Sequence, residues 1–238
     1  MLQYQKDFVI HLIESKALTF EPTQLMSGRL SPYYVSMRTA VSDGAKASRT
    51  TEAYVRRILS SDFRDVDYLH GPAYAGIPLA CLIATQLWKS KKWNLRWGYN
   101  RKETKNYGRP SEKMIVGDLE DRDTVLIVDD VITTGKTKML NWQMLCNIKK
   151  ELKLKGILVA FDRQEIDEAG QTTAQWLKQE GIDLYSVLNL TETLTWLHHR
   201  EINGMVPVDD DVFKRVRNYM MQYGGETAKK AWYTVNHA

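Results

Sequence analysis

The sequence predicts an α/β fold, a doubly wound and mostly parallel sheet with helices packed on its faces. Short runs rich in apolar and aromatic residues, at 66–70, 125–128 and 156–161, alternate with segments of helical periodicity. The uninterrupted apolar run 125–128 is typical of a strand that is buried on both faces of a parallel sheet. Polar residues that end such strands should lie at one edge of the sheet, where open α/β sheets bind ligands.

Each expected element has its own local pattern. The first helix has Phe8, Leu12 and Ile13 at helical spacing, and Asp43 is the N-cap candidate of the second. The expected helices cover residues 2–17, 43–59, 76–87, 136–150 and a segment that Thr191 could cap. The expected strands cover residues 66–70, 95–99, 125–128, 156–161 and 184–188. Strands that alternate with helices in this way favour the parallel sheet.

Length and composition allow one sizeable core. The chain has 238 residues, 43% of them hydrophobic, and we expect one domain over residues 1–198 with a helical C-terminal extension, residues 199–238, that is not an independent domain. A net charge of +4 is too mild for a nucleic-acid signature. Cys81 and Cys146 lie outside metal-type spacings, which favours a reducing, cytoplasmic setting. No apolar run approaches the roughly 18 residues of a membrane span, so neither nucleic acid nor membrane is an expected partner.

The segment 125–137 carries the chemistry. Asp129 and Asp130 end an apolar strand, and Thr-Thr-Gly follows two residues later. If the residues from Lys136 onward are helical, the backbone N–H groups of this turn face the positive end of a helix dipole, which favours phosphate. We interpret the segment as a phosphate cradle beside two acids that can hold a diol. The alternative is an ordinary strand-to-helix turn with an acidic end, but these features rarely coincide by accident.

A nucleoside-triphosphate P-loop competes with this interpretation, because Gly135-Lys136-Thr137 copies the end of that motif. A P-loop needs a glycine five residues before Gly135, where this chain has Asp130. The charge of Asp130 would repel the phosphates that the loop should wrap. The sequence therefore argues against a P-loop.

The same segment resembles the phosphoribosyl pyrophosphate (PRPP) binding motif of type I phosphoribosyltransferases. The resemblance implies that Asp129 and Asp130 hold the ribose hydroxyls and that the following turn holds the 5′-phosphate. The PRPP contacts that it implies here are Asp129, Asp130, Val131, Ile132, Thr133, Thr134, Gly135, Lys136 and Thr137.

Two loops resemble segments of the orotate phosphoribosyltransferases within that family. Residues 26–33, Met-Ser-Gly-Arg-Leu-Ser-Pro-Tyr, depart at Met26, where the family usually has a lysine that contacts PRPP. Residues 71–78, Gly-Pro-Ala-Tyr-Ala-Gly-Ile-Pro, match the pyrophosphate-binding loop except at Ala75, where many members have lysine. The resemblance implies that Tyr74 and Ala75 contact PRPP.

Residues 100–117 are polar and predict a mobile loop that carries five cations. A closing basic loop can surround a departing pyrophosphate with positive charge and exclude water. The alternative is a solvated surface, but Asn-Arg-Lys-Glu-Thr-Lys-Asn-Tyr-Gly resembles the hood loop of orotate phosphoribosyltransferases. The resemblance implies PRPP contacts by Arg101, Lys102, Lys105 and Tyr107, with Lys105 reaching across a dimer interface into the neighbouring site.

Arg163 follows the strand 156–161 within Asp-Arg-Gln-Glu, which stands at the same place in the family. A planar guanidinium can hold the carboxylate of orotate bidentately. The alternative is a surface arginine paired with Glu165. The base contacts that the resemblance implies are Tyr34, Val35, Thr133 and Arg163.

These motifs, all within residues 1–195, imply an orotate phosphoribosyltransferase that takes PRPP and orotate as substrates and forms a homodimer. Lys105, Asp129 and Asp130 are the expected catalytic residues. Two alternatives remain open: a catalytically weakened PRPP sensor, and a phosphoribosyltransferase for a different base. The hood cations argue against the sensor, and Arg163 argues for an acidic base.

Mg²⁺ is the expected cofactor, because a tetra-anionic leaving group needs charge neutralisation. We expect it to be bound through PRPP, with no direct protein ligand. His198 and His199 have no carboxylate or cysteine at ligand spacing in the sequence. Because Met26 and Ala75 each replace a cation of the family, Lys136 is a candidate to supply part of the missing charge.

Overall fold

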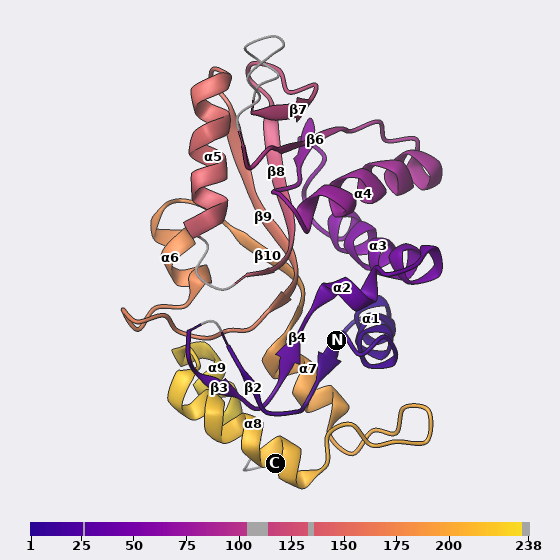
Figure 1. The fold of residues 1–238 in the computed structure, drawn as a ribbon, viewed down its shortest axis with the longest axis vertical. Coiled ribbons are helices and arrows are strands. Elements are labelled where there is room, and N and C mark those ends of the chain that lie inside the picture. Colours follow the sequence, from indigo (N-terminus) through magenta and orange to yellow (C-terminus); the bar gives the residue numbers. More distant parts are fainter. Residues whose placement is uncertain (26, 104–113, 133–135, 235–238) are drawn as a thin grey trace.

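The computed structural model describes residues 1–25, 27–103, 114–132 and 136–234, which form a central six-stranded sheet (Figure 1). The strand order is β10-β9-β8-β5-β6-β7, and all neighbours are parallel except β6 and β7. The strands are β5 (Tyr68–His70), β6 (Arg96–Asn100), β7 (Ile115–Gly117), β8 (Thr124–Ile132), β9 (Lys153–Asp162) and β10 (Leu184–Asn189). The predicted doubly wound, mostly parallel α/β fold is therefore confirmed.

Strand β8 is buried on both faces of the sheet. Val125 and Ile127 belong to one apolar cluster, whereas Leu126 and Val128 belong to the other. This division follows from the alternation of side chains along a strand. The uninterrupted apolar run in the sequence arises because both of these clusters need apolar side chains from the same strand.

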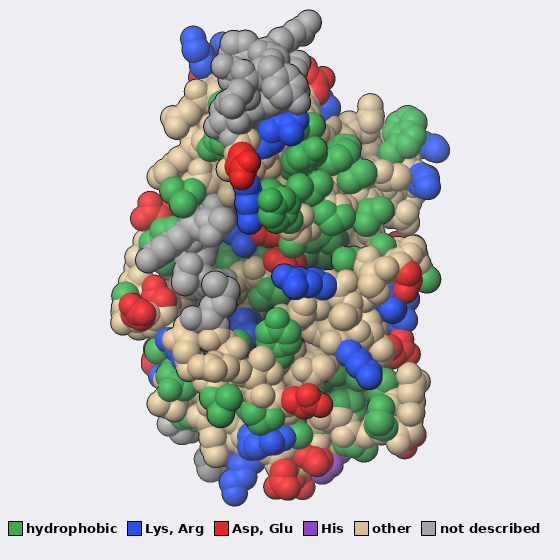
Figure 2. Space-filling view, viewed as in Figure 1, with side chains coloured by type: hydrophobic (Ala, Val, Ile, Leu, Met, Phe, Trp, Pro, Cys, Tyr) green, Lys and Arg blue, Asp and Glu red, His purple; other side chains and the backbone are tan. Residues whose placement is uncertain are grey.

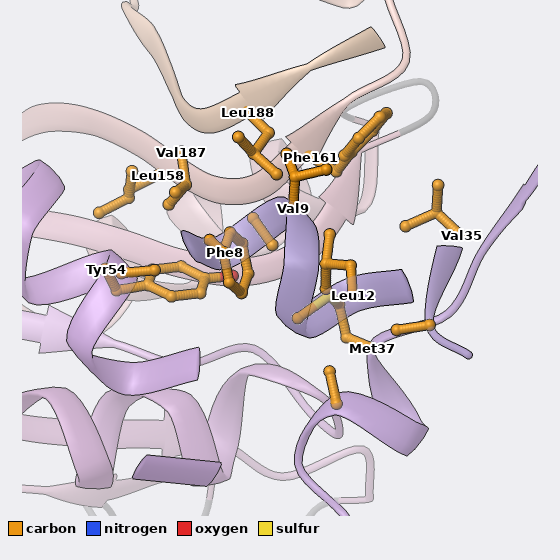
Figure 3. Packing of buried hydrophobic residues seen from close by; sticks show 14 of the residues in the cluster. Phe8, Val9, Leu12, Val35, Met37, Tyr54, Leu158, Phe161, Val187 and Leu188 are labelled. Carbon is orange, nitrogen blue, oxygen red and sulfur yellow. The ribbon is translucent and has the colours of Figure 1, made fainter. Parts of the chain in front are cut away.

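Helices cover both faces. One side of the sheet carries α5 and α6, and the other carries α1, α3 and α4 (Figure 1). The bounds are α1 (Gln3–Glu14), α3 (Gly44–Leu59), α4 (Gly76–Lys91), α5 (Lys136–Ile148) and α6 (Thr173–Gln179). In Figure 3, Phe8 and Leu12 of α1 and Tyr54 of α3 pack in one cluster with Leu158 of β9. The amphipathic first helix is thus a core helix.

The helix starts show where local sequence signals were sufficient. Asp43 caps α3 as predicted, since its carboxylate accepts a hydrogen bond from the Lys46 N–H at 2.9 Å. Thr191 does not cap the helix α7 (Leu190–Leu197). Asn189 does so instead, and the Thr191 hydroxyl donates to Gln164 Oε1 at 2.7 Å. The Thr191 side chain, which the sequence pattern assigned to the cap, therefore makes a tertiary hydrogen bond to Gln164 instead.

Several short elements complete the fold. Strand β7 lies inside the segment 100–117, which the sequence assigned to a loop. The sequence pattern missed it because β7 is an edge strand of three residues with polar flanks. The N-terminal region also contains two small antiparallel pairs and a short helix. Their bounds are β1 (Leu18–Thr19), β2 (Thr23–Gln24), β3 (Leu30–Ser31), β4 (Tyr34–Val35) and α2 (Met37–Ala40).

The C-terminal segment forms α8 (Asp210–Tyr223) and α9 (Glu226–Thr234). Val216, Met220 and Trp232 from these helices are fully buried and join the cluster that contains α1. The division of the chain at residues 198 and 199 stays a prediction. Within the described part of the chain, no helix is both long and apolar enough to cross a membrane.

Replacing Trp232 with alanine should destabilise the whole protein, because the indole is fully buried against Phe213. We expect a loss of about 3–5 kcal/mol in the free energy of unfolding, measured by urea denaturation followed by circular dichroism. Trp88, which is 49% exposed on α4, is the matched control, and Trp88→Ala should cost about 1 kcal/mol or less. Equal losses in the two variants would contradict the placement of α9 in the core.

Candidate active site

Four parallel strands end at one edge of the sheet and bring polar residues together there. The ends of β5, β6 and β8 carry His70, Asn100 and the acids Asp129 and Asp130, and Arg163 follows β9 directly. Figure 2 shows basic and acidic side chains next to one another in the middle of this face, beside the residues drawn in grey. This edge is where ligands of open α/β sheets bind.

The two adjacent acids of β8 have different environments. Asp129 is only 6% exposed, and its Oδ2 lies 2.6 Å from the Nζ of Lys138. Asp130 is half-buried, and its Oδ1 accepts a hydrogen bond from the Val131 N–H at 2.7 Å. Among the described residues, Asp130 forms no ion pair. Asp130 is therefore the acid whose charge is left for a ligand.

Lys138 is a site residue that the sequence analysis missed. It lies in the first turn of α5, and its side chain returns to the end of β8. Burial raises the pKa of Asp129; the Lys138 ammonium opposes this rise, and the charge of Asp130 adds to it. The Tyr54 hydroxyl fixes the same point of the strand by donating to the Asp129 carbonyl oxygen at 2.6 Å. The sequence signal for Lys138 was weak: it is the second basic residue after the Thr-Thr-Gly turn, three residues beyond Gly135.

The glycine loop after β5 packs tightly under the site. A Cβ on Gly71 would overlap the carbonyl oxygen of Gly76, so the loop closes only with a glycine there. The Ala73 N–H donates to Asn100 Oδ1 at 3.1 Å, which ties the loop to the end of β6. Tyr74 and Ala75 are exposed at the tip of this loop. Their contact with PRPP stays a prediction.

His70 lies beneath this loop and is fully buried. Burial lowers its pKa to about 4, although the neighbouring amides of Asn141 and Asn100 favour the protonated form. The imidazole is therefore neutral near pH 7. It is placed as a structural residue at the end of β5.

The start of the hood loop lies over the glycine loop. The Lys102 Nζ is 4.2 Å from the centre of the Tyr74 ring, in a cation–π contact. The Arg101 N–H donates to the Met114 carbonyl oxygen at 2.7 Å, which closes the base of the loop. Several predicted site residues lie outside the described residues, either entirely or in their side chains. They are Met26, Lys105, Tyr107, Thr133, Thr134, Gly135, Lys136 and Thr137.

Arg163 is buried, with 6% of its surface exposed, and is paired with Glu165. Its Nη2 and Nε donate to Glu165 Oε1 at 2.6 and 3.0 Å, and Nη2 also donates to Ser31 Oγ at 3.2 Å. The sequence analysis left open that Arg163 is a surface arginine paired with Glu165. The pairing is present, but Arg163 is buried and does not lie on the surface. Among the described residues, Arg163 Nη1 has no hydrogen-bond partner. One edge of the guanidinium is therefore free to contact a ligand.

A second arginine lies on the other side of Glu165. Arg29 Nη1 is 3.9 Å from Glu165 Oε2 and donates to the Ile166 carbonyl oxygen at 2.9 Å. Tyr33 stacks under Arg163, with the guanidinium carbon 4.4 Å from the ring centre, and donates to Glu165 Oε1 at 2.6 Å. Two cations thus face one carboxylate. Arg163, Arg29 and Glu165 together carry a net positive charge. We call the part of the site that they form the base side, because the base is expected to contact Arg163.

The two residues that were predicted to contact the base from β4 differ in exposure. Tyr34 is 41% exposed, whereas Val35 is buried and pairs with Leu18 of β1. A side chain buried in this way can offer only its backbone groups to a ligand. Both predicted contacts remain untested.

The donors at the strand edge suit a magnesium ion bound through a phosphate ligand. Hard cations prefer oxygen ligands, and Asp130 has a carboxylate oxygen without an ion-pair partner among the described residues. His198 and His199 offer another donor set, because the fold brings Asp210 Oδ1 to within 2.9 and 3.0 Å of their Nε2 atoms. Ligand spacing along the sequence did not indicate this carboxylate, because Asp210 comes beside the two histidines only through the fold. Imidazoles are poor magnesium ligands. The helix dipole stabilises the Asp210 carboxylate in the first turn of α8, so this carboxylate needs no metal ion to explain its position.

Replacing Lys138 with methionine should raise the pKa of Asp129 further, because the ammonium that lowers it is gone. When the pKa of a carboxyl is higher in the folded than in the unfolded state, the protein loses stability as the pH rises from the unfolded-state pKa through the folded-state pKa. The loss of stability relative to wild type should therefore reach about 3 kcal/mol at pH 7 and shrink as the pH falls. Urea denaturation at several pH values and ¹³C NMR titration of aspartate carboxyls measure the two effects. Lys150→Met, at an exposed position beyond α5, is the control, and a pH-independent loss in Lys138→Met would refute the ion pair.

Comparisons with known proteins agree on one family, although no family model matches the chain. The orotate phosphoribosyltransferase of Clostridium beijerinckii is 31% identical over 227 residues, which are 95% of this chain and 100% of that protein. That of Kluyveromyces lactis is 33% identical over 229 residues, which are 93% and 96% of the two chains. The crystal structure of the Francisella tularensis orotate phosphoribosyltransferase has a TM-score of 0.77 at 26% identity and covers 92% of this chain and 99% of its own.

The matches extend beyond the segments that carry the sequence motifs. The first match leaves about a twentieth of the chain uncovered, so it includes most of residues 199–238, which the sequence motifs had not reached. The similarity to this relative therefore reaches into the C-terminal segment. On the identity and coverage of these relatives, the chain belongs to the orotate phosphoribosyltransferases, which are pentosyltransferase enzymes.

Proposed function

We propose that this chain transfers the phosphoribosyl group from PRPP to a ring nitrogen of orotate, giving orotidine 5′-phosphate and pyrophosphate. The observation that carries the proposal is the charge at the base side of the site, where Arg163 and Arg29 face the single carboxylate of Glu165. A net positive charge in a largely buried position favours an anionic base. The open Nη1 edge of Arg163 gives the carboxylate of orotate a charge-assisted contact.

The acids of β8 act on the ribose. Asp130 can accept hydrogen bonds from the ribose hydroxyls, because among the described residues its carboxylate has no cationic partner. The same negative charge favours the positive charge that develops on the sugar as pyrophosphate leaves. Asp129 supports this arrangement, since its pairing with Lys138 holds it at the strand end. Mg²⁺, when bound, supplies charge neutralisation on the leaving pyrophosphate.

The leaving group lies between the glycine loop and the hood loop in this proposal. Tyr74 and Ala75 present the glycine loop, and Arg101 and Lys102 begin the hood. The cation–π contact between Lys102 and Tyr74 supports a closure in which these two loops meet. Closure would surround the pyrophosphate with positive charge and exclude water.

We also propose a homodimer in which Lys105 of one subunit completes the site of the other. The support for it is the resemblance of the hood sequence to that of the family. A cytoplasmic setting is proposed as well, and the two free cysteines, Cys81 and Cys146, agree with a reducing environment.

Incubation with PRPP, Mg²⁺ and orotate should consume orotate, which is followed by its absorbance. Asp130→Asn should slow this reaction by about a hundredfold, because it removes a charge that acts on the transition state. Orotate that is not consumed, together with PRPP binding detected by calorimetry, would favour a PRPP sensor. PRPP consumption with another base and not with orotate would favour a phosphoribosyltransferase of different specificity.

A mixture of Lys105→Ala and Asp130→Asn subunits tests the dimer. If Lys105 acts across the interface, each mixed dimer has one intact site, and random mixing restores about a quarter of the wild-type activity. Each variant alone provides the control. If the mixture is no more active than the two variants measured separately, Lys105 does not act in the neighbouring site.

A further inference from the structure

Glu165 links the base side of the site to the C-terminal helix α8. Its carboxylate is largely buried and has partners on both oxygens. Oε1 accepts hydrogen bonds from Arg163 and Tyr33, while Oε2 accepts one from the Tyr219 hydroxyl at 3.1 Å. Among the described residues that contact this carboxylate, Tyr219 is the one that comes from α8. Its position fixes the second oxygen and, with it, the rotation of the carboxylate.

The rotation of Glu165 decides how Arg163 is held. Both hydrogen bonds from Arg163 to Glu165 end on Oε1, so they keep their geometry only while that oxygen stays in place. Without Tyr219, the partner left to Oε2 among the described residues would be Arg29, whose Nη1 is 3.9 Å away. The carboxylate would then turn toward Arg29 to shorten that pair. The guanidinium of Arg163 would lose its fixed orientation.

The backbone holds Tyr219 in place for this task. The Ile166 N–H donates to the Tyr223 carbonyl oxygen at 2.8 Å, and the Gly225 N–H donates to the Gln164 carbonyl oxygen at 2.9 Å. These two bonds fasten the end of α8 to the loop that carries Glu165. The Tyr219 ring also meets the Tyr33 ring edge-on at 6.2 Å.

The Tyr219 hydroxyl stays protonated and acts as a donor. Burial raises its pKa, and the charge of Glu165 raises it further. Burial likewise raises the pKa of Tyr33 well above its ordinary value. Two neutral hydroxyls therefore donate to one carboxylate, and the charge of Glu165 remains available to Arg163.

We propose that Tyr219 is a positioning residue for the anionic base: through Glu165 it holds the Arg163 guanidinium with its open Nη1 edge toward the bound carboxylate. This inference rests on the proposed function, since it takes orotate as the ligand of Arg163. It gives the C-terminal helix a role in substrate recognition, for which the sequence offered no chemistry. Tyr219 itself does not touch the substrate in this scheme.

The test is Tyr219→Phe, which keeps the ring packing and removes only the hydroxyl. The KM for orotate should rise by about threefold to tenfold, because the lost hydrogen bond to Glu165 weakens the contact of Arg163 with orotate indirectly. The KM for PRPP should stay unchanged. Tyr223→Phe is the matched control, one turn later on α8: the Tyr223 hydroxyl makes no hydrogen bond among the described residues, and the substitution keeps the ring, whose centre is 4.6 Å from the Arg29 guanidinium carbon. A KM for orotate in Tyr219→Phe equal to that of wild type and of Tyr223→Phe would overturn the proposal. A similar rise in both KM values would also overturn it, since that pattern indicates general damage.

A second measurement does not depend on activity. The ¹⁵N–¹H signal of the Arg163 Nε group should be slow to exchange in the wild type, because Nε donates to Glu165. It should broaden in Tyr219→Phe and not in Tyr223→Phe. An unchanged signal in Tyr219→Phe would refute the positioning role even if the wild type failed to consume orotate. In that case the failure of the proposed function would be seen separately, in the wild-type assay.

Discussion

The parallel alignment of β8 between β5 and β9 is the constraint on which the site depends. Asp129 pairs with Val159 and Ile132 pairs with Asp162, so Arg163 follows β9 just beyond the acids of β8. A shift of one residue would turn Asp129 and the apolar residues before it to the opposite faces of the sheet. The clusters on both faces of β8 prevent such a shift, because each needs its own set of apolar side chains. The hydrophobic core therefore sets the geometry of the charged site.

Two buried ion pairs divide the site into regions of opposite charge. Lys138 compensates Asp129, whereas Asp130 has no cationic partner among the described residues. Glu165 compensates Arg163, and Arg29 beyond it leaves the base side positive. Burying a lone charge is costly. Asp130 accordingly lies beside the Asp129–Lys138 pair, and Arg29 lies beside the Arg163–Glu165 pair. This arrangement suits a reaction in which the sugar becomes cationic between an anionic base and an anionic leaving group.

The sequence predicted the parts of the structure that depend on local pattern. An apolar run that ends in paired acids, a glycine loop after a strand and an Asp N-cap each have a signature within about ten residues. Lys138 had only a weak signal, because its role depends on where the first turn of α5 points its side chain. The contact between Glu165 and Tyr219 spans 54 residues of sequence, and no local pattern can indicate such a pairing. Strand β7 was missed because an edge strand of three residues needs no apolar alternation.

The C-terminal helices illustrate how a distant segment becomes part of recognition. A buried carboxylate such as Glu165 must have its lone pairs satisfied, and one of its donors, Tyr219, comes from α8. Helix α8 in turn is held by α9, whose Trp232 packs edge-on against Phe213. The orientation of Arg163 thus depends on packing that begins at Trp232. Loosening α9 should therefore weaken the discrimination between anionic and neutral bases before it disturbs the acids of β8, because among the described residues Asp129 and Asp130 form no hydrogen bond or ion pair with the C-terminal helices.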